Sequence, residues 1–401
     1  MKLLSSYPKE VKIFLVASLV NSAGSSLMWP LITMFVFGHL GRSMTDAGIA
    51  ILVQSLGGIF GQLIGGGLYY RIGVKKLIVG SIGLNALTLI TLPFMTDYWF
   101  IFIIFMALIG FFNSMSMPAI QAFIGFRFAD KRGSLFNVIY VANNLGVALG
   151  TALSGVLARI SYDLSFIMNG LTSACFAAFF FIYLNRLEHR EGSLHLEKKK
   201  SATAGISPLI LLKDTRLYLF MGAGVLLGWL GNSVWNNGVS PHIISLGMLE
   251  WKYSILWTLN GVLIFAAQPI TQWIKRTFAE RATSQMTWSA IFYLLGYLFI
   301  LTVHSYYGLI IAMVLATLGE MLVSPAIPEF ISERTDQAAP FYLGLVGGLG
   351  SVGRVIGPFV MGVLYDHGGL YPVAWLAVAM AMLSFVSFFI HSVLHKSSYN
   401  V

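Results

Sequence analysis

The chain alternates long apolar stretches with short polar connections. A helix of about 20 mostly apolar residues is long enough to cross a bilayer. Twelve such stretches can be placed along the sequence. Their approximate limits are 13–38, 45–70, 76–95, 99–126, 134–158, 163–185, 216–240, 251–274, 284–303, 306–333, 339–364 and 371–395. The pattern therefore predicts an all-α membrane protein with 12 transmembrane helices.

One long polar segment divides these spans six and six. It runs from Asn185 to about Asp214 and is rich in charged residues. We therefore expect an N-terminal six-helix bundle over 1–185, a cytoplasmic central linker over 186–214 and a C-terminal six-helix bundle over 215–401.

The composition supports a membrane protein. Of the 401 residues, 57% are hydrophobic and 10% are charged, against about 25% charged in soluble domains. The 14% aromatic content excludes a disordered chain. The single cysteine, Cys175, can form neither an intramolecular disulfide nor a zinc cage.

The basic residues predict the orientation. With the N-terminus inside, three of the 25 Lys and Arg residues lie outside (Arg42, Arg159 and Lys252), one lies within a span, and the other 21 lie at inner ends. Because cytoplasmic loops carry an excess of Lys and Arg, we expect both termini to be cytoplasmic in a plasma (inner) membrane protein. The net charge of +9 then needs no nucleic-acid partner.

The two predicted halves contain an internal repeat. Residues 118–124 read PAIQAFI and residues 325–331 read PAIPEFI, an offset of 207 that also pairs Arg127 with Arg334. The same offset places Gly146, Gly150, Gly155, Val156 and Leu157 on Gly353, Gly357, Gly362, Val363 and Leu364. We infer a parallel duplication, the arrangement that places a transport site at the midplane between two pseudo-symmetric halves.

The loop after the second span resembles a signature of the major facilitator superfamily. In the segment 66–76, five positions match the family pattern Gly-x-Leu-Ala-Asp-Arg-x-Gly-Arg-Lys: Gly66, Leu68, Arg71, Gly73 and Lys75. Tyr70 stands where that family has an aspartate that helps to latch its halves, and Val74 stands where it has its first basic residue. The resemblance extends over essentially the whole chain and implies the major facilitator fold.

The glycine-rich fifth span is similar to that of the drug/proton antiporters of this superfamily. Its glycines are Gly146, Gly150 and Gly155, and the Gly-Pro step typical of that branch occurs in the repeat copy as Gly357-Pro358, after Gly353. Small residues at this spacing let helices approach closely, and proline kinks a helix. Close packing alone is one interpretation, and a moving helix pair, as the resemblance implies, is the other.

Two charged residues are expected near mid-membrane. Glu320 lies 14 positions beyond residue 306 and Arg354 lies 15 positions beyond residue 339, or about 21 and 22 Å along antiparallel helices. A lone charge at this depth costs at least about 2.5–3.5 kcal/mol, so we expect the two to be partners. They form either a static ion pair or a proton-coupling site, because burial favours a protonated carboxyl group and a nearby arginine favours the ionised form.

Further candidates are polar or aromatic residues within the spans. Each could bind substrate, or could join one helix to another. The substrate-binding candidates are Asn21, Gln54, Asn113, Tyr140, Asn143, Asn144, Trp229, Asn232, Trp235, Asn236 and Asn260.

The resemblance implies a secondary transporter, for which we expect proton-coupled efflux of small amphipathic compounds. Transport of one defined metabolite or lipid precursor is the alternative, and a membrane enzyme or receptor is a third possibility from another class. The sequence has no Gly-x4-Gly-Lys-Ser/Thr phosphate loop, so it is not its own ATPase. We expect no catalytic residues, no metal and no cofactor. The expected partners are a small-molecule substrate, protons and the lipid bilayer, with a monomer as the functional unit.

Overall fold

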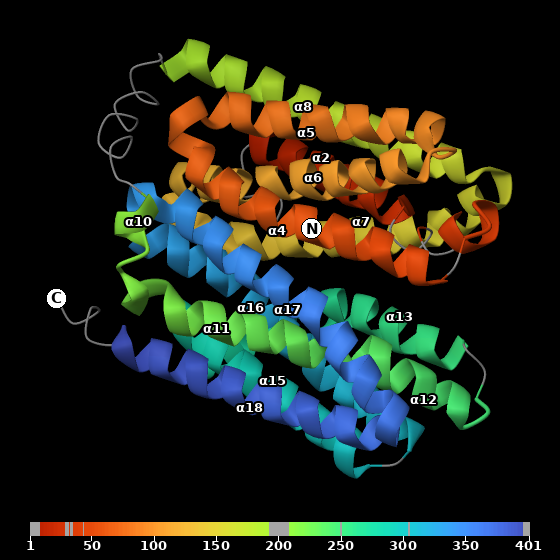
Figure 1. The fold of residues 1–401 in the computed structure, drawn as a ribbon. Helices are drawn as coiled ribbons and strands as arrows, with labels where there is room; N and C mark the ends of the chain where they lie inside the picture. Colours follow the sequence, from red (N-terminus) through yellow and green to blue (C-terminus); the bar gives the residue numbers. More distant parts are fainter. Residues whose placement is uncertain are drawn as a thin grey trace. The chain divides into compact units, whose positions relative to one another are not determined.

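The structure is a computed structural model that describes residues 9–28, 32, 35–42, 44–191, 208–248, 251–303 and 305–395 (Figure 1). The ordered elements among these residues are helices, and no strand occurs among them. The expected all-α fold is confirmed. Residues 192–207 of the expected linker, and the outermost residues of both ends, lie outside the described residues.

The helices form two compact units. The first unit comprises Met1–Pro208 and Thr335–Gly344. Its long helices lie lengthwise beside one another (Figure 1). Its elements are α2 (Lys9–Met28), η2 (Phe35–His39), α4 (Met44–Ile72), α5 (Val74–Thr91), η3 (Leu92–Met95), α6 (Trp99–Arg127), η4 (Ala129–Lys131), α7 (Arg132–Ile160) and α8 (Tyr162–Glu191), with η6 (Asp336–Ala338).

The second unit comprises Leu209–Arg334 and Leu345–Val401, so α17 begins in the first unit and continues in the second. The short helix α10 (Pro208–Leu211) lies at its start. Its elements are α11 (Thr215–Asn232), η5 (Trp235–Val239), α12 (Ser240–Ser245), α13 (Trp251–Ala266), α14 (Gln268–Thr277), α15 (Ala282–Thr302), α16 (Tyr306–Arg334), α17 (Ala339–Gly368) and α18 (Leu370–Leu394).

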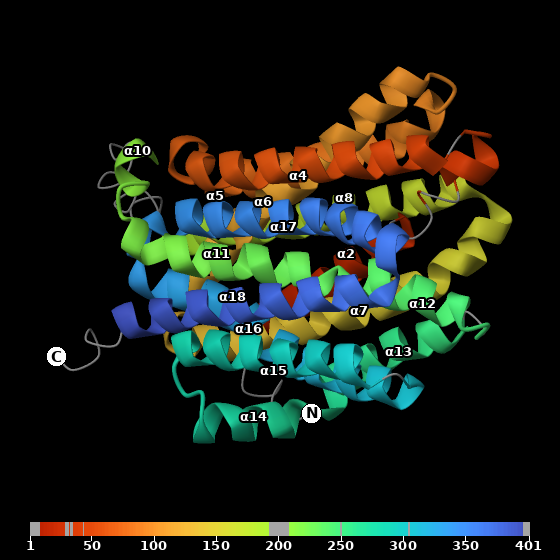
Figure 2. The same ribbon diagram turned by 60° about the horizontal axis from the view of Figure 1, so that its bottom comes forward.

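Eleven of the described helical stretches are long and apolar enough to cross a membrane, and Ile255–Ala266 is a shorter apolar helix. The predicted span 251–274 is therefore not one helix. Pro269 lies in the first turn of α14, where it has no N–H to donate and its ring crowds the preceding turn. The span breaks at Ala267 into α13 and α14, which Figure 2 shows as separate segments.

Most helix contacts of the first unit recur in the second, six spans later. In the first unit α4 packs on α6, α5 on α6 and α8, and α2 on α7 and α8. In the second unit α13 packs on α16, α15 on α16 and α18, and α11 on α18. Each contact of the second list is the counterpart of one in the first, so the two six-helix bundles are pseudo-symmetric.

The glycines of the repeat lie at the closest helix crossings. Gly146 and Gly150 of α7 face the carbonyl oxygens of Leu19 and Ala23 of α2, so closely that a Cβ would clash. In the second unit Gly353 of α17 meets the carbonyl oxygen of Leu226 of α11 in the same way. Leu226 lies 207 residues after Leu19, so the repeat extends to the first and seventh spans, where the sequence comparison had not found it.

Each unit has its own apolar core. In the first, Phe35, Phe102 and Phe166 pack together with almost no exposed surface. In the second, Trp235 is 1% exposed and lies in a core with Val239 and Met361.

Candidate functional site

Glu320 lies in the middle of α16 and accepts a hydrogen bond from an amide. The Nδ2 of Asn260 on α13 donates to Glu320 Oε2 at 3.2 Å and to Thr317 Oγ1 at 3.0 Å. Thr317 in turn donates to the carbonyl oxygen of Met313, one turn earlier on α16, at 2.7 Å. Asn260 therefore joins α13 to α16 at the level of the carboxylate.

Two tyrosines of α15 interact electrostatically with Glu320. Tyr293 and Tyr297 lie one helical turn apart, and the carboxylate acts on both hydroxyl groups. The hydroxyl of Tyr297 also donates to Asn232 Oδ1 of α11, at 3.4 Å. Glu320 is thus part of a polar group contributed by α11, α13, α15 and α16.

Sequence reasoning did not find Thr317, Tyr293 or Tyr297. The available signal was spacing, because Thr317 lies three residues before Glu320 and the tyrosines lie four residues apart, which places each pair on one helix face. That spacing does not tell which helix a face meets, so it could not connect the tyrosines to the acid.

Arg354 has a different environment, midway along α17. Its guanidinium carbon lies 4.6 Å from the ring centroid of Trp229 on α11. Its Nη2 donates to Ser351 Oγ at 3.1 Å, one turn earlier on α17. The side chain of Arg354 is exposed, and Trp229 is 37% exposed.

Glu320 and Arg354 were expected to be partners, but the contacts found at them differ. Glu320 accepts a hydrogen bond from an amide and acts electrostatically on two tyrosines, whereas Arg354 contacts an indole ring and a hydroxyl group. Counting residues places Glu320 and Arg354 at similar positions along their helices. It does not tell which neighbouring helix each side chain faces.

The first-unit candidates on α2 and α7 take part in interhelical hydrogen bonds. Asn143 Oδ1 accepts from Ser18 at 2.7 Å and from Ser22 at 3.0 Å. Ser173 of α8 donates to Asn21 Oδ1 at 3.5 Å. These bonds hold α2 against α7 and α8, which is the packing role left open for such residues.

Other first-unit candidates are placed differently. Asn144 Nδ2 donates to the carbonyl oxygen of Tyr140 within α7, at 2.9 Å, and both side chains are half-buried. Asn113, the repeat counterpart of Glu320, has an exposed side chain on α6. Among these three, Asn113 is therefore the most accessible to a ligand.

The two candidates near the end of the seventh span have structural partners. Trp235 is buried in the apolar core described above. Asn236 Oδ1 accepts a hydrogen bond from the hydroxyl of Tyr253 at 2.6 Å, although Asn236 itself is exposed. Core packing explains Trp235, so Trp229, Asn232 and Asn260 are the stronger ligand candidates of this unit.

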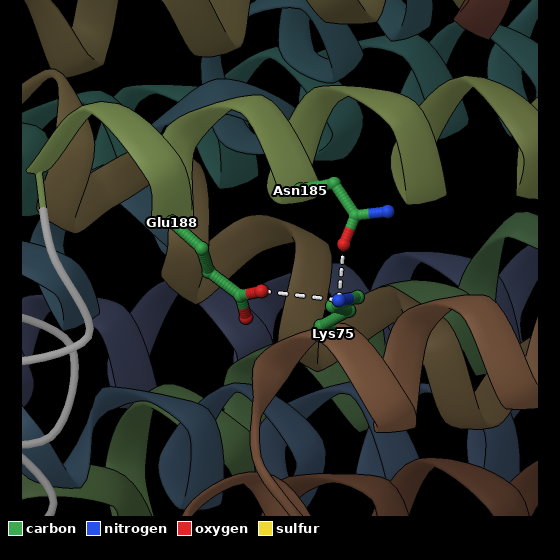
Figure 3. Close-up of polar contacts among 3 residues, drawn as sticks. All are labelled: Lys75, Asn185 and Glu188. Carbon is green, nitrogen blue, oxygen red and sulfur yellow. Dashed lines mark hydrogen bonds and ion pairs between the residues drawn. The ribbon is translucent and has the colours of Figure 1, made fainter.

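In the family-like segment 66–76, a glycine forms the turn between α4 and α5, and an ion pair fixes the start of α5. Gly73 has a φ of 84°, a conformation that glycine adopts without steric cost, and it lets α5 follow α4 directly. Lys75 Nζ forms an ion pair with Glu188 Oε2 at 3.0 Å and donates to Asn185 Oδ1, both on α8 (Figure 3). Lys75 therefore joins α5 to α8.

The other motif residues lie at the end of α4. Leu68 lies in the helix, Arg71 lies in its last turn, and Gly66 faces the backbone of Pro340 so closely that a Cβ would clash. Of the remaining repeat residues, Gly155 lies in α7. Gly357 precedes Pro358 inside α17 and faces the hydroxyl of Ser233, the residue that follows α11.

The chain matches one protein family over most of its length, and known transporters are similar to it in sequence and in fold. The family model described as Major Facilitator Superfamily matches residues 14–339. YttB of Bacillus subtilis (strain 168), an uncharacterized MFS-type transporter, is 31% identical, over 98% of this chain and 97% of its own. The quinolone resistance protein NorA of Staphylococcus aureus is 23% identical, over 86% of each chain. The crystal structure of a bacterial homologue of the iron transporter ferroportin has a similar fold, with a TM-score of 0.76 at 14% identity over 96% of this chain and 100% of that one.

Proposed function

Because the chain belongs to the major facilitator superfamily, we propose that it is a secondary active transporter that exports small amphipathic compounds in exchange for protons. The family match and the apolar helices make it a multi-pass membrane transporter. The proposal adds the direction, the coupling ion and the class of substrate. It also places both termini in the cytoplasm and the protein in the plasma membrane.

The observation that carries the proposal is the environment of Glu320. An acid in mid-membrane is costly and is a functional-site candidate by default. Here the carboxylate accepts a hydrogen bond from Asn260 and interacts with the hydroxyls of Tyr293 and Tyr297. Such a group is well suited to bind and release one proton, because the surrounding donors can adjust to either protonation state.

Protonation of Glu320 would change the bonds that join the helices. The ionised carboxylate accepts from Asn260, whereas the protonated group has one hydrogen to donate. Since Asn260 connects α13 to α16, the change in protonation alters the contact between these two helices. Alternating access needs a coupling of this kind, in which proton binding favours one state of the transporter.

The relatives support export of drug-like compounds. NorA is named for quinolone resistance, which fits a transporter that removes an amphipathic compound. The candidates for substrate contact are Trp229, Asn232 and Asn260 in the second unit, and Asn113, Tyr140 and Asn144 in the first. Asn21 and Asn143 serve mainly to join helices in this proposal.

The test is transport in inside-out membrane vesicles. A panel of lipophilic dyes and drugs is added to energised vesicles that contain the full chain, and substrate-induced proton release is followed with a pH-sensitive fluorescent dye. The wild type is compared with Glu320→Gln and with Glu333→Gln, a control that removes an exposed carboxylate from the last turn of the same helix.

We expect proton release with several compounds in the wild type and in Glu333→Gln, and a loss of at least tenfold in Glu320→Gln. Unchanged coupling in Glu320→Gln would overturn the role of Glu320. Failure of folded wild-type protein to move any compound on the panel would overturn broad efflux and favour one defined metabolite or lipid precursor.

A further inference from the structure

We propose that Arg354 and Trp229 form a binding subsite for an anionic amphiphile, a compound with a carboxylate, sulfonate or phosphate ester group on an aromatic or aliphatic body. The inference rests on the proposed function in one respect: the bound anion is taken to be the transported compound. Its other support is the geometry around the guanidinium.

The two contacts found for the guanidinium are electrically neutral. The ring of Trp229 lies 4.6 Å away and Ser351 Oγ lies 3.1 Å away. A guanidinium has five N–H donors in a planar fork that matches carboxylate, sulfonate and phosphate oxygens. A ring face and one hydroxyl neutralise none of its charge, so a bound anion would gain a charge-assisted pair of hydrogen bonds.

The cost of the site also indicates an anion. A charged side chain within a membrane span is costly unless it is paired or solvated. The cation–π contact with Trp229 offsets part of that cost. An anionic ligand would supply the remaining stabilisation when the transporter is loaded.

Arg354 does not lie on the exposed apolar face of α17. Ile356, Phe359 and Val363 form an exposed apolar face, at 42%, 75% and 44% exposure. At 3.6 residues per turn they are rotated from Arg354 by about 200°, 140° and 180°. The side chain of Arg354 therefore points away from this apolar face, toward the side on which α17 meets α11, where a polar ligand group is compatible.

Trp229 gives the subsite its apolar part. Gly350 of α17 lies beside it, and a Cβ there would come within 3.2 Å of the indole. The absence of that side chain leaves room for the indole to lie beside α17 and stack on Arg354. An aromatic ligand could contact the exposed part of Trp229 while its charged group bonds to the guanidinium.

The repeat confines this chemistry to one half. The counterparts of Arg354 and Trp229, 207 residues earlier, are Val147 and Ser22. Neither can bind an anion by charge, so a single subsite is expected in the chain.

The test is binding to purified full-length protein in detergent, by calorimetry, with three probes of one shape. They are naphthalene-2-sulfonate, 2-naphthylmethanol and 2-naphthyltrimethylammonium. The variants are Arg354→Gln, Arg354→Lys and a matched control, Arg42→Gln. Arg42 also stacks on a tryptophan, with its guanidinium 4.3 Å from the Trp99 ring, but it is paired with Asp46 at 3.6 Å.

We expect the wild type to bind the sulfonate at least tenfold more tightly than the alcohol, and the cation more weakly than both. Arg354→Gln should lose this preference while still binding the alcohol, Arg354→Lys should keep part of it, and Arg42→Gln should keep all of it. Equal affinity for the three probes, or an unchanged preference in Arg354→Gln, would overturn the proposal.

Two further arms separate the sources of the anion and the two proposals. Displacement of the sulfonate by dihexanoylphosphatidylglycerol, and not by dihexanoylphosphatidylcholine, would identify a lipid headgroup as the anion bound at this subsite. Glu320→Gln should bind the sulfonate normally, because no proton gradient is involved. Absence of proton-coupled efflux in the wild type, together with intact Arg354-dependent binding, would count against the proposed function alone.

Discussion

Replacing Gly353 by alanine should destabilise the second unit by crowding the crossing of α17 and α11. The new Cβ would clash with the carbonyl oxygen of Leu226, and backbone atoms cannot move aside as the end of a flexible side chain can. Overpacking of this kind costs about 1–3 kcal/mol. Against it stands the gain of about 1 kcal/mol that alanine has over glycine within a helix.

Gly362→Ala is the matched control, because it makes the same change on the same helix. The nearest atom to a Cβ there is the Asn237 amide nitrogen, at 4.0 Å, which is an ordinary contact. Both variants gain the same helix propensity. Their free energies of unfolding should therefore differ by about 1–3 kcal/mol, and this difference reports the overpacking at the crossing of α17 and α11 alone.

Both variants would be purified in one detergent and unfolded at one heating rate, since the unfolding of such proteins depends on the rate of heating. Gly353→Ala should unfold at a clearly lower temperature than Gly362→Ala. If Gly353→Ala is equally or more stable, the close approach of the two helices is not as the structure has it.

Three further predictions concern other parts of the chain. Lys75→Met should weaken the contact of α5 with α8 by about 0.2–1 kcal/mol, because the paired side chains are 29% and 39% exposed. A double-mutant cycle with Glu188→Gln would measure this coupling energy, and a value of zero would contradict the prediction. Pro269→Ala should join α13 to α14, which would appear as slower amide hydrogen exchange at the junction, whereas unchanged exchange would mean that proline does not cause the break. Burial and neighbouring arginines lower the pKa of His395, so the unfolded chain binds more protons there. Stability should then fall as the pH drops below about 6.5. Thermal unfolding of His395→Asn between pH 8 and pH 5 should show a smaller fall, and an equally steep fall in the variant would contradict the assignment to His395.

The spans were predictable because burial in lipid demands a long apolar helix, and length is visible in a sequence. The break at Ala267 was missed for the opposite reason. The stretch 251–274 is apolar enough throughout, and the effect of Pro269 on the helix is local and leaves the mean hydropathy of the stretch unchanged. The duplication was visible where the residues are alike, but it was missed in α2 and α11, where few residues are shared and mainly the backbone crossing is repeated.

The candidate site could be predicted in part. Depth along the helix follows from counting residues, which placed Glu320 and Arg354 correctly in the middle of α16 and α17. Their partners depend on which neighbouring helix each face meets, and that is a property of the packed bundle. The tyrosines near Glu320 and the tryptophan at Arg354 come from helices far away in the sequence, so the position of the charges along their own helices could not reveal them.

The duplicated crossing explains why the charges belong to one half. In the first unit, Asn143 of α7 fills the space between the helices and bonds to Ser18 and Ser22. At the same place in the second unit, Gly350 contributes no side chain, and the side chains of Val225 and of Trp229, at the position of Ser22, lie there. The indole then provides a surface on which the guanidinium of Arg354 stacks. The glycines hold the two backbones at the same distance in both halves, so the side chains between them can differ without moving the helices, and a charged subsite can exist in one half of an otherwise symmetric frame.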